Sequence, residues 1–264
     1  MKMVPKVLIQ KSLNWLGLEL HRLPTEEQKR QIAEQHKQIV EQHRLTLEAE
    51  QRKLWLKSTG VKTVIDIGAN IGQFAQEIHE ALPEALIYSF EPLKDCYEEL
   101  FAKAKGIPQF RVFNVALGDE SGEIDIYSNE FSPSSSFLPM ENLHKECFPY
   151  TKEVIPQKVK ILRLDDIASS LDLPQPILVK IDVQGFEDRV ISGGMSVINR
   201  ASTLIIELSI EKLYKDQLLF DEMYRLITKL GFQYRGNYDQ LQNPDDRRIL
   251  QVDGIFTRSR ALDY

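Results

Sequence analysis

The fold of this chain is decided by the stretch Thr63-Val64-Ile65-Asp66-Ile67-Gly68-Ala69-Asn70-Ile71-Gly72. An apolar run ends at Asp66, and the residues at Gly68, Asn70 and Gly72 tolerate the positive φ angles of a tight turn. A helical pattern follows over 73–82. This order predicts a buried strand, a turn and a helix N-terminus, an arrangement that brings a nucleotide-like ligand against backbone N–H groups.

The position of the carboxylate selects the class of cofactor. A dinucleotide-binding turn reads G-x-G-x-x-G, whereas this turn reads D-x-G-x-N-x-G. The carboxylate of Asp66 would repel a pyrophosphate, but it suits a ligand with an ammonium group, such as S-adenosylmethionine. A second apolar run, over 85–90, ends at Glu91-Pro92, and a carboxylate at that place typically accepts hydrogen bonds from ribose hydroxyls. We therefore expect a cofactor site formed by Asp66, Gly68, Asn70, Gly72, Glu91 and Pro92.

Size and charge exclude several classes of protein. The chain has 264 residues, is 42% hydrophobic and carries a formal charge of −6, which argues against a nucleic-acid-binding surface. Cys96 and Cys147 lack metal-type spacing and are interpreted as reduced thiols of a cytoplasmic protein. No apolar run reaches the ~20 residues of a membrane span, and the N-terminus lacks a signal-peptide pattern.

Residues 1–60 are predicted to form a helical extension. Thr25 caps a long polar helix with a thin, heptad-like apolar stripe, but the complementary core positions hold His36, His43 and Glu50. A strong coiled coil is therefore not indicated. A lid or an arm for homodimerisation is favoured over docking of the first 20 residues on a membrane surface.

Residues 61–264 are predicted to form one α/β domain. Strand patterns at 63–67, 85–91, 110–117, 177–183 and 203–208 alternate with helical patterns at 73–82, 93–105, 186–198 and 220–230. Two last strands, 232–236 and 248–258, form a hairpin without a helix between them. We expect a Rossmann-like, seven-stranded, mostly parallel sheet with helices on both faces, the architecture of class I methyltransferases.

An insertion at 118–165 interrupts this alternation. Two short strand patterns, at 123–127 and 159–164, flank a loop rich in serine, proline and aromatic residues. A long irregular loop inside a compact domain is usually functional or disordered, and its aromatic residues favour a functional loop. Ser135, Ser136 and Phe137 are accordingly candidates for binding the substrate.

The chain resembles the FkbM family of methyltransferases over roughly residues 60–258. The resemblance is carried by Ile65–Gly72, Phe90-Glu91-Pro92, Asn114–Gly118, Ser134-Ser135-Ser136, Leu164-Asp165-Asp166 and Lys180–Glu187. One departure is Gln184, where the family usually has glutamate. The resemblance implies O-methylation of a hydroxyl, often on a sugar, a polysaccharide or a secondary metabolite, with S-adenosylmethionine as the methyl donor.

Methyl transfer to a hydroxyl also needs a group that removes the proton. Asp182 is the first candidate, followed by Glu207 near the end of the next strand and His144 from the loop. Lys180 must be paired if buried, with Asp182 or with Glu187, and such an ion pair could be structural or catalytic.

Further contacts are expected around these groups. Asn114 and Ala116 are candidate adenine contacts, although ordinary strand-end residues would look the same. Glu187 is a candidate substrate contact. A magnesium ion held by Asp182 and Glu207 is a weaker expectation.

Two alternatives compete with a glycan or small-molecule O-methyltransferase. One is a binding or scaffold protein that keeps the fold without turnover. The other is a nicotinamide dehydrogenase, which Asp66 and the glycine register disfavour. The chain also lacks the Asp/Asn-Pro-Pro-Tyr/Phe element that amino-methylating nucleic-acid enzymes use, since Lys180-Ile-Asp-Val-Gln-Gly occupies that place.

Overall fold

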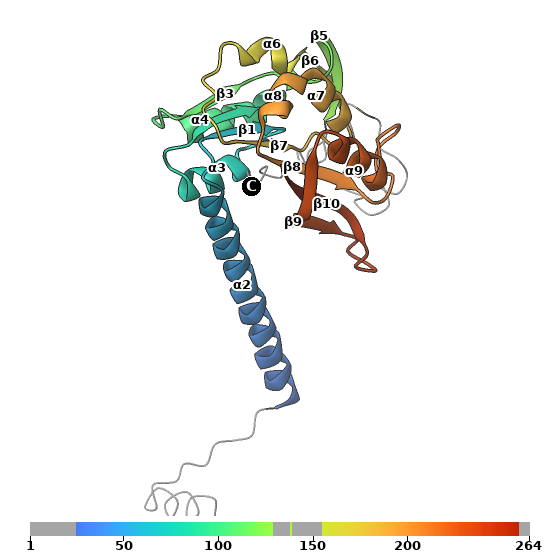
Figure 1. The fold of residues 1–264 in the computed structure, drawn as a ribbon. Coiled ribbons are helices and arrows are strands. Elements are labelled where there is room, and N and C mark those ends of the chain that lie inside the picture. Colours follow the sequence, from blue (N-terminus) through green and yellow to red (C-terminus); the bar gives the residue numbers. More distant parts are fainter. Residues whose placement is uncertain (1–24, 129–137, 139–154, 259–264) are drawn as a thin grey trace, which may run out of the picture. The chain divides into compact units, whose positions relative to one another are not determined.

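The computed structural model describes residues 25–128, residue 138 and residues 155–258 (Figure 1). The chain divides into two compact units, Met1–Gln51 and Arg52–Tyr264. The boundary lies inside helix α2 (Glu26–Thr59), so this helix begins in the first unit and ends in the second. The predicted division at residue 60 stays a prediction.

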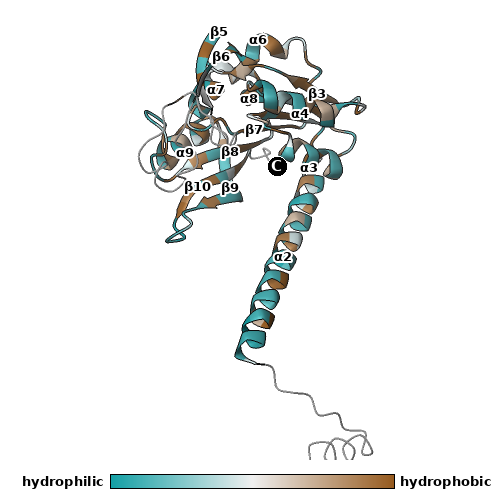
Figure 2. Ribbon diagram, turned by 180° about the vertical axis from the view of Figure 1, so that it is seen from behind, coloured by the Kyte–Doolittle hydropathy of each residue, from teal (hydrophilic) through white to brown (hydrophobic). Residues whose placement is uncertain are grey.

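The part of α2 in the first unit is polar and well capped. Thr25 Oγ1 accepts a hydrogen bond from the backbone N–H of Gln28, and the Thr25 N–H donates to the Gln28 side chain. Hydrophilic colouring prevails along α2 in Figure 2, with scattered hydrophobic turns. The thin apolar stripe is exposed along Ile32, Ile39, Val40 and Leu47. Among the described residues, no helix has the length and hydropathy that crossing a bilayer would need.

A seven-stranded sheet forms the centre of the second unit. Its order is β3 (Phe110–Phe113), β2 (Leu86–Phe90), β1 (Thr63–Ile67), β7 (Ile177–Ile181), β8 (Thr203–Ser209), β10 (Ile249–Arg258) and β9 (Phe232–Gln242). β10 runs antiparallel to both of its neighbours, while the pairs from β3 to β8 are parallel. The predicted mostly parallel sheet with a closing hairpin is therefore confirmed.

Apolar side chains cover both faces of this sheet, because successive residues of a strand point to opposite sides. One core joins Val64 and Leu178 to Ile78 of α3 (Gln73–Ala81) and Leu100 of α4 (Lys94–Ala104). The opposite core contains residues of α7 (Glu187–Gly193), α8 (Met195–Arg200) and α9 (Phe220–Lys229). Helices on both faces were predicted, and the structure confirms them.

The predicted strand at 110–117 is wrong in one respect. It breaks after Phe113, and its second half forms β4 (Ala116–Leu117) in a separate three-stranded sheet with β6 (Ile155–Leu162) and β5 (Gly122–Ser128). The break coincides with Asn114, whose side-chain Nδ2 donates to the backbone carbonyls of Glu91 and Pro92. These bonds tie the chain to the end of β2 instead of extending β3.

Other boundaries also differ from the predictions: for example, the strand expected at 232–236 extends to Gln242 and the one expected at 177–183 ends at Ile181. The strand expected at 159–164 ends at Leu162, and Leu164 opens the short helix α6 (Leu164–Ala168). The single helix expected at 186–198 is divided at Gly193-Gly194. A Cβ atom at Gly193 would lie 1.8 Å from the carbonyl oxygen of Gly118, so the chain has no room for a side chain there.

Candidate cofactor and acceptor site

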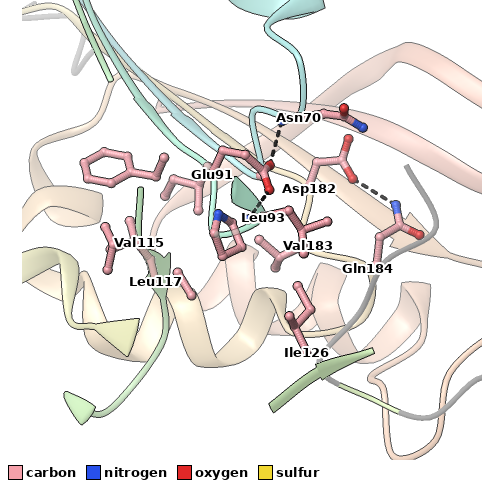
Figure 3. Close-up of a pocket in the computed structure, with 14 residues that line it drawn as sticks. Asn70, Glu91, Leu93, Val115, Leu117, Ile126, Asp182, Val183 and Gln184 are labelled. Atoms are coloured by element: carbon pink, nitrogen blue, oxygen red, sulfur yellow. Dashed lines mark hydrogen bonds between the residues drawn. The ribbon is translucent and has the colours of Figure 1, made fainter. Parts of the chain in front are cut away.

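Two cavities meet where β1, β2 and β7 end, at the edge of a parallel sheet where open α/β folds bind their ligands. The apolar cavity is drawn in Figure 3 and is lined mainly by Phe90, Pro92, Leu93, Val115, Ala116, Leu117, Ile126 and Val183, together with Glu91 and Gln184. The polar cavity is lined by Arg52, Asp66, Gln73, Phe74, Glu77, Lys180, Tyr238, Asp239 and Asp253. Gly68, Asn70 and Asp182 line both cavities, so the two cavities adjoin.

The turn after β1 separates the two cavities. Gly68, Asn70 and Gly72 all have positive φ angles, of 79°, 49° and 88°. A Cβ atom on Gly68 would lie 1.8 Å from the backbone oxygen of Asp182, so the ends of β1 and β7 touch here. Gly72 lines neither cavity, and a Cβ atom there would lie 2.6 Å from Leu100. Its requirement for glycine thus comes from its positive φ angle and from the packing of Leu100 in α4.

Glu91 places a buried carboxylate in the apolar cavity. Its Oε2 accepts a hydrogen bond from the backbone N–H of Asn70 and its Oε1 from that of Leu93, both at 2.8 Å (Figure 3). Burial raises the pKa of Glu91 to about 7, although these two hydrogen bonds oppose the shift. Each carboxylate oxygen has a second lone pair, so the group could accept two more donors, such as a pair of ribose hydroxyls.

The two predicted adenine contacts separate in the structure. Ala116 lines the apolar cavity between Val115 and Leu117, and these small and aliphatic walls suit a flat heterocycle. Asn114 does not line it, because its side-chain amide is bonded to two backbone carbonyls at the end of β2. The sequence could not distinguish these two roles, since an asparagine at a strand end could equally contact adenine or bond to the backbone.

Asp66 lies in the floor of the polar cavity and is fully buried. Ser89 donates a hydrogen bond to its Oδ2, whereas Oδ1 has no hydrogen-bond partner within the part of the chain that the structure describes. Burial raises the pKa of Asp66 to about 6, against the attraction of Lys180. A buried acceptor without a donor fits a ligand that brings one, and an ammonium group would satisfy it.

Lys180 is surrounded by carboxylates. Its Nζ lies 2.7 Å from Asp182 Oδ2, which is one of the two predicted ion pairs. Burial alone would lower the pKa of Lys180, but Asp182, Asp253 and Asp66 raise it above its usual range. Burial also raises the pKa of Asp253 to about 6. Asp253, on β10, was missed from the sequence because it comes from a strand far along the chain.

Asp182 and Glu207, the first two candidates for the base, are joined through a third residue. Gln184 Nε2 donates to Asp182 Oδ1 at 3.0 Å and to Glu207 Oε1 at 2.8 Å, and Tyr214 Oη donates to Gln184 Oε1 at 2.8 Å. Burial, followed by the nearby carboxylates, raises the pKa of Glu207 well above its usual range. Tyr214 carried no sequence signal, since it lies in a loop after β8.

Glu187 is buried and supports the turn after β7. Its Oε1 accepts hydrogen bonds from the backbone N–H groups of Val183 and Gly185, at 3.1 and 3.0 Å. Gln184 and Gly185 have φ angles of 55° and 98°, a conformation that these bonds stabilise. The predicted substrate contact of Glu187 stays a prediction.

Four predicted site residues, Ser135, Ser136, Phe137 and His144, lie outside the described residues. Leu138 is described, and it packs against Leu213, Tyr214 and Leu250. A Cβ atom on Gly185 would lie 3.2 Å from Leu138 Cδ1. One residue of the serine-rich segment therefore lies beside the turn that carries Gln184.

The predicted magnesium ligands do not fit a metal ion in this arrangement. Oxygen atoms of Asp182 and Glu207 both approach Gln184 Nε2, so an amide nitrogen with two N–H donors stands between them. Within the described ranges, no group of three or more His, Cys, Asp or Glu side chains is placed to hold a metal ion. The donor set thus matches a hydrogen-bonded network better than a coordination sphere.

Comparison with known proteins gives one family model, the methyltransferase FkbM domain, which matches residues 66–234. The 2-O-methyltransferase NoeI of Sinorhizobium fredii is 30% identical over 59% of this chain and 66% of its own length. The antimetabolite synthetase AmbE of Pseudomonas aeruginosa is 26% identical over 70% of this chain and 10% of its own length. The hexuronic acid methyltransferase AglP of Haloferax volcanii is 26% identical over 54% of each chain. This chain spans less than two thirds of each of these relatives.

Proposed function

Because the chain belongs to the FkbM family of methyltransferases, we propose that it transfers the methyl group of S-adenosylmethionine to a hydroxyl of a sugar, a glycan or a glycosylated secondary metabolite. The observation that carries the proposal is the pair of buried carboxylates on either side of one turn. Glu91 lies in an apolar cavity and Asp66 in the adjoining polar cavity. This pairing suits a ligand with an apolar, hydroxylated end and a cationic end.

The apolar cavity would hold the adenosine part of the cofactor. Val115, Ala116 and Leu117 would contact the base, and Glu91 would accept hydrogen bonds from the ribose hydroxyls. The unpartnered Oδ1 of Asp66 would receive the methionine ammonium, directly or through a water molecule. Gly68 and Asn70 line both cavities, so they would contact the region of the cofactor where its adenosine and methionine parts join.

When bound, S-adenosylmethionine supplies a methyl group on a positively charged sulfur, and its transfer is an in-line displacement. The residues of this chain would bring the acceptor hydroxyl into line and remove its proton. Asp182 is the proposed base: it lines both cavities, and Lys180 and Gln184 hold one oxygen each. As the O–CH₃ bond forms and the S–CH₃ bond breaks, the hydroxyl proton would pass to the Asp182 carboxylate.

The acceptor class is proposed from the relatives. NoeI is a 2-O-methyltransferase and AglP a hexuronic acid methyltransferase, which supports a hydroxylated, sugar-like acceptor. Gln184 lies next to the proposed base, and its amide is held by Glu207 and Tyr214. The acceptor is expected on the side where Asp182 lines the cavities.

Binding of S-adenosylmethionine and S-adenosylhomocysteine, measured by calorimetry, tests the cofactor. Wild-type protein should bind both with micromolar affinity, whereas Glu91→Ala and Asp66→Ala should lose that binding. Methylthioadenosine lacks the amino-acid end, so Asp66→Ala should retain it while Glu91→Ala should not. Glu123→Ala, at an exposed position, serves as the control. Circular dichroism verifies that each variant is folded, and absence of binding by the wild type would overturn the proposed function.

A further inference from the structure

The side-chain amide of Gln184 lies between two carboxylates. Its Nε2 donates one hydrogen bond to Asp182 and one to Glu207, while its Oε1 accepts a hydrogen bond from Tyr214. The bond to Asp182 is visible in Figure 3. Only the NH₂ group can donate to carboxylates and only the carbonyl oxygen can accept from a hydroxyl, so the network fixes which way the amide points.

Neighbouring residues hold this amide in place. Gln184 has a left-handed backbone with φ 55°, and Glu187 stabilises that turn through the N–H groups of Val183 and Gly185. On the other side, Gln217 Oε1 accepts hydrogen bonds from the backbone N–H groups of Leu213 and Tyr214. Gln217 is itself buried and donates to Ser209 Oγ at 2.7 Å. One end of the network is therefore anchored to the turn after β7 and the other to Ser209 of β8.

The surroundings of Gln184 are strongly acidic. The titratable and charged groups around this network are Asp66, Glu91, Lys180, Asp182, Glu187, Glu207, Tyr214 and Asp253. Two carboxylates that approach each other need a proton, a cation or a pair of N–H donors between them. The amide supplies two donors, carries no charge and does not titrate.

We propose that Gln184 is a positioning residue whose amide takes the place of a bridging cation, holding the carboxylates of Asp182 and Glu207 in one fixed arrangement without a metal ion. The amide thereby keeps Asp182 directed at the acceptor hydroxyl. This catalytic consequence rests on the proposed function, whereas the electrostatic role of the amide does not.

The variant Gln184→Glu tests the electrostatic role, because a carboxylate has nearly the same shape as the amide but offers no N–H donors. Three carboxylates then face one another, and the folded state must take up a proton or a cation to relieve their repulsion. The thermal midpoint of Q184E should therefore fall further below that of the wild type as the pH rises from 5 to 8. Millimolar Mg²⁺ or Mn²⁺ should recover much of the loss at pH 8 and leave the wild type unchanged.

Two further variants separate this effect from a general loss of packing. Gln233→Glu adds the same charge at an exposed position of β9 and should show no such pH dependence. The double variant Gln184→Glu with Glu207→Gln restores one amide among two carboxylates, so its deficit should no longer grow with pH. It also keeps the test decisive if Q184E alone does not fold.

The kinetic arm measures methyl transfer with saturating cofactor. In Q184E, kcat should fall by roughly 30-fold or more and recover in part with Mg²⁺, because a disturbed general base loses part of its typical contribution of about 10²- to 10⁴-fold. Tyr214→Phe keeps the amide but loses the hydroxyl that orients it, so its smaller loss should not respond to the metal. Cofactor affinity should change little in Tyr214→Phe, since Tyr214 lines neither cavity.

The two proposals fail separately. If the wild type does not bind S-adenosylmethionine, the proposed function fails, while the stability measurements still decide the role of Gln184. A deficit of Q184E that is equal at pH 5 and pH 8, unaffected by the ions and by the Glu207→Gln exchange, would overturn the role assigned to Gln184.

Discussion

At Glu91, two opposing effects act on one carboxylate. Burial raises its pKa to about 7, while hydrogen bonds from Asn70 and Leu93 favour the charged form. A protonated carboxyl offers fewer acceptor sites to the ribose hydroxyls, so affinity for S-adenosylmethionine should weaken as the pH falls. A single group with this pKa predicts a roughly tenfold higher Kd at pH 6 than at pH 8. Calorimetry at three pH values measures this change in Kd.

The same experiment contains its own control. At pH 7 binding should release part of a proton from Glu91, so the measured enthalpy should depend on the ionisation enthalpy of the buffer. Glu91→Gln removes this group, and its weaker binding should lose most of the pH dependence. A wild-type affinity that is constant from pH 6 to pH 8 would contradict the role given to Glu91.

Asp182 is the residue on which turnover should depend most. Asp182→Asn keeps the shape of the side chain but cannot accept the hydroxyl proton, so kcat should fall by about 10²- to 10⁴-fold. Cofactor affinity should stay close to that of the wild type, since asparagine keeps the size and shape of the side chain. Single-turnover assays with a panel of sugar acceptors provide the measurement, and unchanged turnover would exclude Asp182 as the base.

At the scale of elements, the contact between the ends of β1 and β7 builds the site. Gly68 combines a φ angle of 79° with a Cβ position only 1.8 Å from the backbone oxygen of Asp182. Gly68→Ala should therefore separate the two strand ends, destabilise the fold by more than about 2 kcal/mol and abolish cofactor binding. Chemical denaturation and calorimetry measure the two effects.

Two other glycines separate the cost of a left-handed backbone from the cost of a steric clash at Cβ. Gly106 also has a positive φ angle, of 87°, but a Cβ atom there meets nothing within 4 Å. Gly106→Ala should cost only the ~1 kcal/mol of the left-handed backbone. Gly122→Ala, at an open site without positive φ, should cost less still. Equal losses in all three variants would show that the β1–β7 contact is not what requires glycine at position 68.

On the scale of the whole molecule, buried acids should make the stability of the ligand-free protein depend on pH. The pKa is raised to about 7 for Glu91 and Glu187 and to about 6 for Asp66 and Asp253. The folded chain thus binds these protons more tightly than the unfolded chain, where carboxyl pKa values are ~4. Their contribution is fully present below about pH 4 and is lost as the pH rises through 6 to 7.

The thermal midpoint without ligand should consequently fall by several degrees between pH 5 and pH 8. S-adenosylmethionine should offset part of the fall, since its ammonium group would pair with Asp66. Scanning calorimetry with and without the cofactor measures both effects. Glu91→Gln should flatten the profile, whereas a midpoint that rises over this range would contradict the assigned pKa shifts.

Self-association through the helical extension stays a prediction. Val40 and Leu47 are seven residues apart, the spacing of a heptad, and are 66% and 45% exposed in the structure, so both are accessible to a partner surface. If the stripe pairs two copies, replacing both residues by serine should convert a dimer into a monomer in light scattering. A wild type that is monomeric at high concentration would exclude the dimerisation arm.

Sequence alone determined the class of the fold and the order of its elements. The hydrophobic periods that identify strands and helices depend only on residues close together in the sequence. Likewise, the glycine, asparagine and acidic residues around Asp66 and Glu91 indicate turns and strand ends, which also depend on near neighbours. For the same reason, the sequence alone places Lys180, Asp182 and Glu207 at neighbouring strand ends.

Tertiary structure alone decided how these groups meet. The predicted strand breaks at Asn114, whose side chain donates a hydrogen bond to a backbone carbonyl at the end of β2. Asp253, on the antiparallel strand β10, acts electrostatically on Lys180 and raises its pKa. In the sequence, Gln184 is only a departure from the family pattern. In the structure, its amide donates hydrogen bonds to Asp182 and Glu207 and accepts one from Tyr214. Such contacts link residues far apart along the chain, and no periodicity encodes them. Burial, which sets the pKa of Glu91 and Asp66, likewise exists only once the sheet and its helices are assembled.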